Sequence, residues 1–383
     1  MNGTADRSLG VYIHIPFCRA RCLYCRFPAR PAGTFTQTKY VENLVKEIGR
    51  WFSSDRGWMV DTIYVGGGTP STLGSADMEL LMKKVMANSP MAVEVSYEVN
   101  PHPEDINKIA ILRKNGVNRL SVGVQSFNDV ELGQSGRLHN SDDTRAFLKR
   151  CREEGIDNLS ADLIHGLPKQ TIESFRESLE ELIDFGPEHV SLYGLMTESD
   201  SRLGELPEAL IPSLSLPDGD DQASMYDLAR EKMQEAGYIQ YEIANFAKPG
   251  FECRHNMAYW SGGEFIGFGP GAASYIDGAR FKRIYDVNKY LDALDGEKNT
   301  IEYFESLSSD RAAAEAVVMG LRKTEGISLN SIETRYGIKL NEIIGDVFSR
   351  YHDAGLLDIA DDNVRLNDKA YFLSDAIFRE IIR

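Results

Sequence analysis

The stretch YIHIPFCRARCLYC, residues 12–25, places Cys18, Cys22 and Cys25 at the spacing C-x3-C-x2-C. The chain has five cysteines in 383 residues, and three of them lie in this one stretch. Thiolates are ligands that soft iron centres prefer, and a short loop of this kind can wrap a metal cluster. Three thiolates can hold three irons of a four-iron cluster and leave the remaining iron open. The spacing therefore predicts a [4Fe–4S] cluster that binds a small molecule.

Two other sites stay open on the cysteine spacing alone. A structural zinc ion would use the three thiols, with His14 as its fourth ligand. A disulfide with one odd thiol is the other alternative, although the N-terminus lacks the charged and then apolar pattern of a secretory signal.

The residues around the cysteines resemble the radical S-adenosylmethionine (SAM) superfamily. The lead-in Tyr12–Cys18 and Tyr24 inside the motif are similar to the branch that contains oxygen-independent coproporphyrinogen dehydrogenase and the HemW-like proteins. This resemblance implies that the amino and carboxylate groups of SAM bind the open iron. It also implies that one electron from the cluster cleaves SAM into methionine and a 5′-deoxyadenosyl radical.

Composition limits the classes of function. Hydrophobic residues make up 42% of the chain, which is enough for a packed core, and no apolar run approaches the length of about 18 residues that a membrane span needs. We therefore expect a cytoplasmic protein without a transmembrane segment, and peripheral membrane contact stays open. The formal net charge of −16 argues against nucleic acid as a partner, because phosphate contacts need clustered Lys and Arg.

Strand and helix patterns alternate through the first half of the chain, which is typical of βα units around a parallel sheet. Six such units are too few for a closed eight-fold barrel, so we predict an α/β fold with an open partial (β/α)6 barrel, as the family resemblance also implies. Functional groups should then lie at the carboxyl ends of the strands. The predicted strands are Gly10–Phe17, Asp61–Val65, Val93–Val99, Arg119–Gln125, Asn158–Ile164 and His189–Leu195. The predicted helices are Gln37–Ser53, Ser75–Asn88, Glu104–Lys114, Ser141–Glu154 and Thr171–Phe185.

Three domains are expected. Residues 1–237 form the radical SAM partial barrel, and residues 238–305 form a small connecting region rich in aromatic residues and glycine. Residues 306–383 form a helical, winged-helix-like module, with a hairpin over Leu356–Leu366. No basic recognition helix marks that module, so we interpret it as a packing unit.

The segment GGGTP, residues 66–70, directly follows the second predicted strand. Glycine allows positive φ angles and close approach of a ligand to the backbone, although a simple turn is the alternative. The segment resembles the family motif whose backbone binds the methionine amino group of SAM. Gly67, Gly68 and Thr69 are therefore predicted SAM contacts.

Further polar side chains follow the predicted strands. Because polar groups at the ends of apolar strands are badly placed for core packing, they are candidates for binding, with capping as the alternative. A guanidinium such as that of Arg137 suits a carboxylate through paired hydrogen bonds. By resemblance, the predicted SAM-binding or cluster-neighbouring side chains are Tyr12, Tyr24, Glu98, Gln125, Arg137 and Asp162.

Three features favour the HemW-like group within this branch. Phe27 stands where the dehydrogenases have a fourth cysteine, His255–Trp260 reads HNMAYW and matches the HNxxYW motif, and Leu366–Phe378 resembles the C-terminus of the group. Imidazole is a standard heme ligand and aromatic rings stack on porphyrins, so His255 is a predicted heme contact. The alternative for His255 is a satisfied core histidine.

The resemblance thus implies a heme chaperone of HemW type that binds heme, SAM and a [4Fe–4S] cluster. Its partners would be an electron donor and an apoprotein that accepts heme. The alternatives are a radical SAM enzyme that oxidatively decarboxylates porphyrinogen propionates, and a related methyltransferase. No catalytic residue is assigned. Arg26, where the family usually has Asp, and Ala273, where many relatives have His, depart from the pattern.

Overall fold

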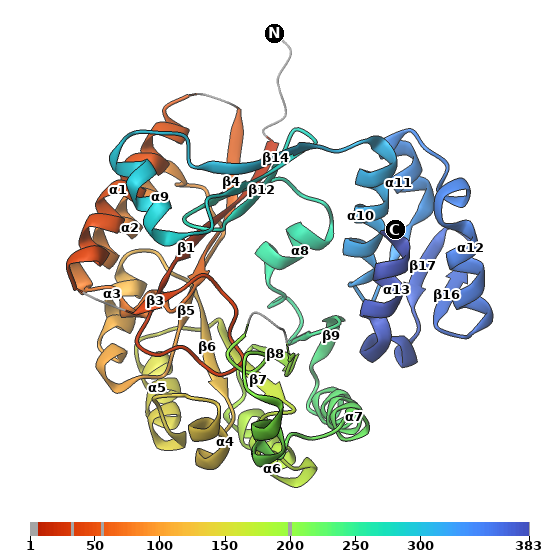
Figure 1. Ribbon diagram of the computed structural model, residues 1–383, viewed down its shortest axis with the longest axis horizontal. Helices are drawn as coiled ribbons and strands as arrows, with labels where there is room; N and C mark the ends of the chain where they lie inside the picture. Colours follow the sequence, from red (N-terminus) through yellow and green to blue (C-terminus); the bar gives the residue numbers. More distant parts are fainter. Residues whose placement is uncertain (1–6, 32–33, 55–56, 198–200, 383) are drawn as a thin grey trace.

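The computed structural model describes residues 7–31, 34–54, 57–197 and 201–382. Within them, one large sheet has the strand order β14-β13-β12-β11-β1-β4-β5-β6-β7-β8-β10-β9 (Figure 1). Six adjacent strands of this sheet are parallel and are arranged in the order in which they occur in the sequence. This arrangement confirms the predicted partial barrel. These strands are β1 (Arg7–Ile15), β4 (Trp58–Gly67), β5 (Glu94–Val99), β6 (Arg119–Gln125), β7 (Leu159–His165) and β8 (His189–Gly194).

Helices cover the outer face of these strands (Figure 1). They are α1 (Thr34–Phe52), α2 (Ser75–Asn88), α3 (Lys108–Lys114), α4 (Asp129–Gln134), α5 (Ser141–Glu153), α6 (Ile172–Phe185) and α7 (Gly219–Glu235). Short elements in the connections are β2 (Phe17–Cys18), β3 (Arg30–Pro31) and the 3-10 turns η1 (Pro70–Thr72), η2 (Pro103–Asp105) and η3 (Glu208–Leu214).

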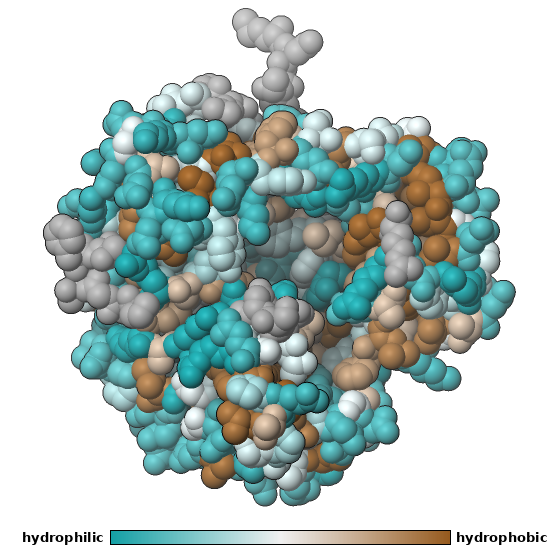
Figure 2. All heavy atoms as spheres, viewed as in Figure 1, coloured by the Kyte–Doolittle hydropathy of each residue, from teal (hydrophilic) through white to brown (hydrophobic). Residues whose placement is uncertain are grey.

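The two faces of the barrel strands differ in polarity. Side chains alternate between the faces of a strand, and Ile13 and Val65 belong to the main apolar core. One residue before each of them, Tyr12 and Tyr64 stack on each other with ring centroids 6.3 Å apart. Polar groups continue along the inner face, where Ser121 donates a hydrogen bond to the Asp162 carboxylate at 3.2 Å. The inner face therefore lines a polar space, and Figure 2 shows the molecule hollowed at its centre.

The connecting region adds strands to both edges of the parallel sheet. β11 (Phe265–Phe268) pairs in parallel with β1, and β10 (Asn245–Ala247) pairs antiparallel with β8. The sequence predicted only short strands and loops packed on the barrel here, because a pairing across more than half of the chain leaves no local pattern. The other elements of this region are β9 (Ile239–Glu242), α8 (Arg254–Trp260), β12 (Ala273–Ile276), β13 (Ala279–Arg283), α9 (Val287–Asp295) and β14 (Ile301–Ser306).

The C-terminal residues form helices and a small sheet with the order β15-β17-β16, which includes the predicted hairpin. Figure 1 shows this module beside the barrel, with α8 between the two. Its elements are α10 (Ser309–Leu321), β15 (Ile327–Ser328), α11 (Leu329–Tyr336), α12 (Leu340–Asp353), β16 (Leu357–Ala360), β17 (Asn363–Leu366), η4 (Asp368–Leu373) and α13 (Ser374–Ile381).

Among the described residues, no helix combines the length and the apolar character needed to cross a bilayer.

A buried ion pair ties α1 to the strands added at the β1 edge. The Arg283 guanidinium lies 2.6 Å from the Glu47 carboxylate, and both side chains are less than one-tenth exposed. Tyr290 and Thr300 also donate hydrogen bonds to Glu47. A buried charge of this kind is stable only while its partners remain.

Arg283→Met should lower the free energy of unfolding by about 3–5 kcal/mol, because the Glu47 carboxylate loses its counter-charge in a buried site. Denaturant unfolding followed by circular dichroism measures this change. Arg350→Met removes an exposed partner of Glu380 and should cost about 1 kcal/mol or less. Equal losses of unfolding free energy in the two variants would show that the buried Arg283–Glu47 pair is not a special source of stability.

Candidate functional site

Cys18 ends β2, and Cys22 and Cys25 lie in the loop that follows, beside the carboxyl ends of the barrel strands. Cys18, Cys22 and Cys25 are free thiols and are partly buried. Burial raises the pKa of Cys18 to about 11 and also raises the pKa of Cys25. As free groups, the Cys18 and Cys25 thiols stay protonated at neutral pH, whereas a thiol that ligates a metal is deprotonated.

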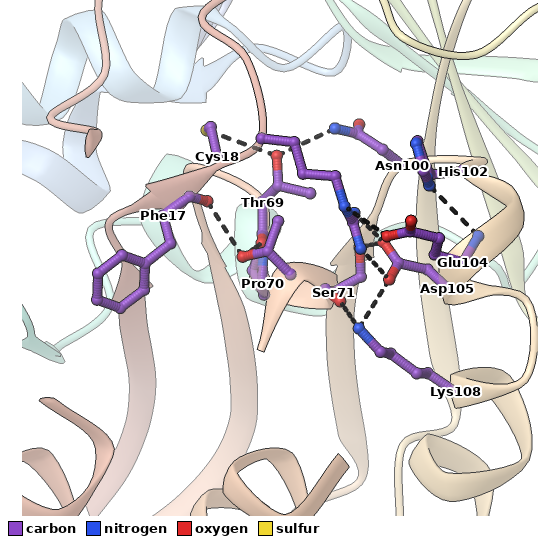
Figure 3. Close-up of polar contacts among 12 residues, drawn as sticks. Phe17, Cys18, Thr69, Pro70, Ser71, Asn100, His102, Glu104, Asp105 and Lys108 are labelled. Carbon is purple, nitrogen blue, oxygen red and sulfur yellow. Dashed lines mark hydrogen bonds and ion pairs between the residues drawn. The ribbon is translucent and has the colours of Figure 1, made fainter. Parts of the chain in front are cut away.

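Hydrogen bonds link two of the cysteines through the ends of the neighbouring strands. The Thr69 hydroxyl contacts Cys18 Sγ at 3.6 Å, and Asn100 Nδ2 donates to Thr69 Oγ1 at 3.0 Å. The Arg137 guanidinium then donates to Asn100 Oδ1 at 2.7 Å and to Cys22 Sγ at 3.4 Å. Figure 3 shows Thr69 between Cys18 and Asn100. We name Cys18, Thr69, Asn100, Arg137 and Cys22 the polar chain.

A second anchor holds the same loop. Arg19, next to Cys18, forms a bidentate pair with the Asp105 carboxylate at 2.6 and 2.7 Å, and Ser71 and Lys108 contact the same carboxylate (Figure 3). Burial alone would raise the pKa of Asp105, but hydrogen bonds from Arg19 and Lys108 hold it below its ordinary value. The cysteine loop is therefore fixed to η1 and η2.

The donor set fits a [4Fe–4S] cluster with three protein ligands. Three soft thiols come from one loop, and the Arg137 guanidinium beside Cys22 would balance the negative charge of bound thiolates. Within the part of the chain that the structure describes, no group of three or more His, Cys, Asp or Glu residues is arranged to hold a single metal ion.

His14 does not complete a zinc site. Its ring nitrogens lie 3.0 Å from the Tyr12 hydroxyl and 3.0 Å from the Pro28 carbonyl oxygen, so both are already hydrogen-bonded. Burial lowers the pKa of His14 to about 4, which keeps the ring neutral. The zinc alternative with His14 as fourth ligand is therefore not supported by the geometry.

The glycine segment packs against the cysteine loop. The backbone N–H of Gly68 donates to the Ile15 carbonyl at 2.9 Å, and that of Thr69 donates to the Phe17 carbonyl at 2.8 Å. A Cβ atom on Gly68 would lie 2.8 Å from the Phe17 carbonyl oxygen, and Gly67 has a φ of +113°. The segment thus needs glycine for its close approach to β2. The approach of a ligand to this backbone stays a prediction.

Two carboxyl groups face the interior of the barrel. Glu98 accepts hydrogen bonds from the Tyr64 hydroxyl at 2.9 Å and from the Gly67 backbone N–H at 3.1 Å. Burial raises the pKa of Glu98 to about 7 and also raises the pKa of Asp162. Since neither group has an ion-pair partner among the described residues, both are suited to a cationic or hydroxyl-bearing ligand.

Gln125 ends β6 with a φ of +70°, which is unusual for a residue other than glycine. The pairing register between β6 and β7 shifts just before it. Strained backbone of this kind costs about 1–3 kcal/mol and persists where the surroundings enforce it, often at functional sites. This backbone strain at Gln125 points to a functional position, and it cannot be detected from the sequence.

The remaining predicted cofactor contacts lie on both sides of the glycine segment. Tyr12 faces the interior, with its hydroxyl on His14. Tyr24 lies in the cysteine loop near Cys22 and Arg137, and burial raises its pKa. The structure thus gathers the cysteines, the glycine segment and the polar strand ends in one region.

Asn100 joins them although it was not predicted. It lies two residues after Glu98, and the strand-end criterion that identified Glu98 applies to it equally.

His255 lies on α8, and its ring stacks on Tyr64, the partner of Glu98, with centroids 5.4 Å apart. Its ring nitrogens are 2.8 Å from the Thr62 hydroxyl and 2.8 Å from the Tyr259 hydroxyl, and the side chain is buried. The backbone N–H of His255 donates to the Glu94 carboxylate, and burial lowers the pKa of the ring to about 3. This geometry favours the alternative that His255 is a core residue with both ring nitrogens hydrogen-bonded, because neither nitrogen is then free for a heme iron. The heme contact of His255 stays a prediction.

The profile of the Radical SAM superfamily matches residues 12–182, and that of the HemN C-terminal domain matches residues 307–373. Heme chaperone HemW of Bacillus subtilis is 34% identical over 370 residues, which cover 96% of this chain and 97% of that protein. Heme chaperone HemW of Lactococcus lactis is 32% identical, with 97% and 96% covered. The structure of coproporphyrinogen III oxidase (HemN) from Escherichia coli, a radical SAM enzyme, superimposes with a TM-score of 0.85 at 25% identity, and covers 98% of this chain and 90% of that one.

Cys22→Ala should reduce the iron content after anaerobic reconstitution from about four irons per chain to near zero, because two thiols cannot retain the cluster. Iron analysis and visible absorption measure this loss. Cys151→Ala is the matched control, since Cys151 is buried in α5 and should leave the iron content unchanged. Wild-type iron content in Cys22→Ala would show that the loop is not the ligand.

Proposed function

The chain belongs to the HemW family of radical SAM proteins, and we propose that it is a heme chaperone that delivers heme to an acceptor protein. One observation carries this proposal: the similarity to curated HemW proteins extends over 96% of the chain. It therefore includes the cysteine loop, the HNxxYW segment and the C-terminal module together. Phe27 in place of a fourth cysteine agrees with this assignment.

The proposal includes two further cofactors. Cys18, Cys22 and Cys25 would hold a [4Fe–4S] cluster, and the interior carboxyl groups would bind SAM. When bound, these cofactors supply one-electron cleavage of the SAM sulfonium. The polar chain fixes the spacing between Cys18 and Cys22, and the Glu98 carboxylate offers an acceptor for an ammonium group at the end of β5.

A second candidate is porphyrinogen oxidation, which the fold similarity to HemN favours. One experiment separates the two. The reconstituted protein receives reductant, SAM and coproporphyrinogen III, and vinyl products are quantified. In parallel, heme-loaded protein is mixed with a heme-free acceptor, and heme transfer is followed by absorption. We expect stoichiometric heme uptake and transfer without repeated turnover, and multiple turnovers of porphyrinogen would overturn the proposal.

SAM binding should strengthen as the pH rises through about 7. Below that pH the Glu98 carboxyl is protonated, because burial raises its pKa to about 7, and a protonated carboxyl binds an ammonium group weakly. His14 and His255 stay neutral in this range, since burial lowers their pKa to about 4 and about 3. Calorimetric titration across this pH range should also detect proton release on binding.

Glu98→Gln should weaken SAM binding by about tenfold or more at alkaline pH and flatten the pH profile, because a charge-assisted hydrogen bond contributes about 1.5–3 kcal/mol. Glu79→Gln, on an exposed face of α2, is the control and should change neither property. A pH profile that persists in Glu98→Gln would assign the titration to another group.

A further inference from the structure

A groove of about 1080 Å³ lies away from the cysteine loop, between the barrel and the C-terminal module. Residues of α7 and β9 line its barrel side, and residues of β17 and η4 line its module side. Small-molecule pockets commonly have volumes of about 300–1,000 Å³. The groove is therefore large enough for a macrocycle.

The walls of the groove are unusually aromatic. Its lining includes Tyr226, Tyr238, Phe246, Tyr371 and Phe372. Tyr226 and Phe372, which come from opposite sides, have ring centroids 6.3 Å apart.

Large apolar side chains are also exposed at this groove. Ile239 on the barrel side is 51% exposed, and Phe372 and Leu373 on the module side are 44% and 50% exposed. Clustered exposure of this kind on a water-soluble surface indicates a binding site. An apolar, planar ligand would cover these side chains.

Cationic groups lie on the module side. Lys369 has no carboxylate partner within the described chain, and Arg365 pairs only with Asp358 in an exposed contact. Arg230 is engaged with Asp368 and lies over the Tyr371 ring. Acidic residues line both sides of the groove, with Asp227 and Glu231 on α7 and Glu325 and Asp368 on the module side. The two on the module side are already paired, Asp368 with Arg230 and Glu325 with Lys323. The groove thus combines aromatic walls with cations at one margin.

An imidazole without hydrogen-bond partners lies behind the aromatic wall. His165, at the end of β7, is 3% exposed, and its Nδ1 is buried with no partner. Its ring packs against Tyr226 and Phe372, with centroids 6.0 and 6.4 Å away. His14, His189 and His255, by contrast, have both ring nitrogens hydrogen-bonded. A buried polar atom without a partner calls for an explanation.

We propose that this groove binds an iron tetrapyrrole. The ring lies on the aromatic walls, its carboxylates meet Lys369 and Arg365, and His165 coordinates the iron when Phe372 turns aside. This inference rests on the proposed heme function and deepens it, because it places the heme apart from His255. It also explains why a neutral imidazole is kept unpaired beneath exposed aromatic rings.

The first test is a hemin titration of the reconstituted protein. Phe372→Asp and Lys369→Glu should each weaken hemin binding by about tenfold or more, because one disrupts the apolar wall and the other reverses the charge that meets a carboxylate. Phe304→Asp on β14 and Lys298→Glu near α9 are matched exposed controls and should leave the affinity unchanged. Unchanged affinity in both groove variants would overturn the inference.

The second test identifies the axial ligand. His165→Leu should alter the electron paramagnetic resonance and Soret signature of bound hemin while leaving iron content and thermal unfolding near wild type, because the imidazole makes no hydrogen bond that the fold would lose. If His255→Phe instead removes the signature and His165→Leu does not, the inference fails.

The outcomes also separate the two proposals. Wild-type protein that does not bind hemin would refute both the heme function and this site. Wild-type binding that ignores every groove variant would refute the site alone.

Discussion

The candidate site depends on the polar chain that runs from Cys18 through Thr69, Asn100 and Arg137 to Cys22. A loop with three reactive thiols has no regular structure of its own, so its geometry must come from outside. The polar chain supplies it from Thr69 after β4, Asn100 after β5 and Arg137 after α4. The Arg137 guanidinium also donates to the Gly123 carbonyl of β6. Because those strands are hydrogen-bonded in register, the two cysteines inherit the rigidity of the sheet. The Arg19–Asp105 pair adds a second fixed point on the same loop.

The polarity of the barrel interior has a related origin. A closed eight-stranded barrel fills its centre with apolar side chains, whereas this sheet leaves its inner face to Tyr12, Tyr64, Glu98, Ser121 and Asp162. Such residues would be costly in a dry core without partners. They are tolerated because they bond to one another and face a hollow, and burial in this interior raises the pKa of Glu98.

Much of this architecture could be predicted from local patterns. Alternating strand and helix patterns predict the six parallel strands that the structure contains. The thiol spacing and the glycine segment predict residues that the structure brings together. Other features depend on contacts between distant residues. Asn100 becomes part of the site only through Thr69 and Arg137, Gln125 shows its strain only in the backbone, and the environment of His255 is set by Thr62 and Tyr259.

The parallel pairing of β11 with β1 has a consequence for biosynthesis. Gly10 pairs with Phe265, so the N-terminal strand emerges from the ribosome long before its partner exists. Until residues 265–268 have been translated, one edge of the nascent barrel presents unpaired N–H and C=O groups. Completion of the sheet at this edge is therefore a late event in synthesis of the chain.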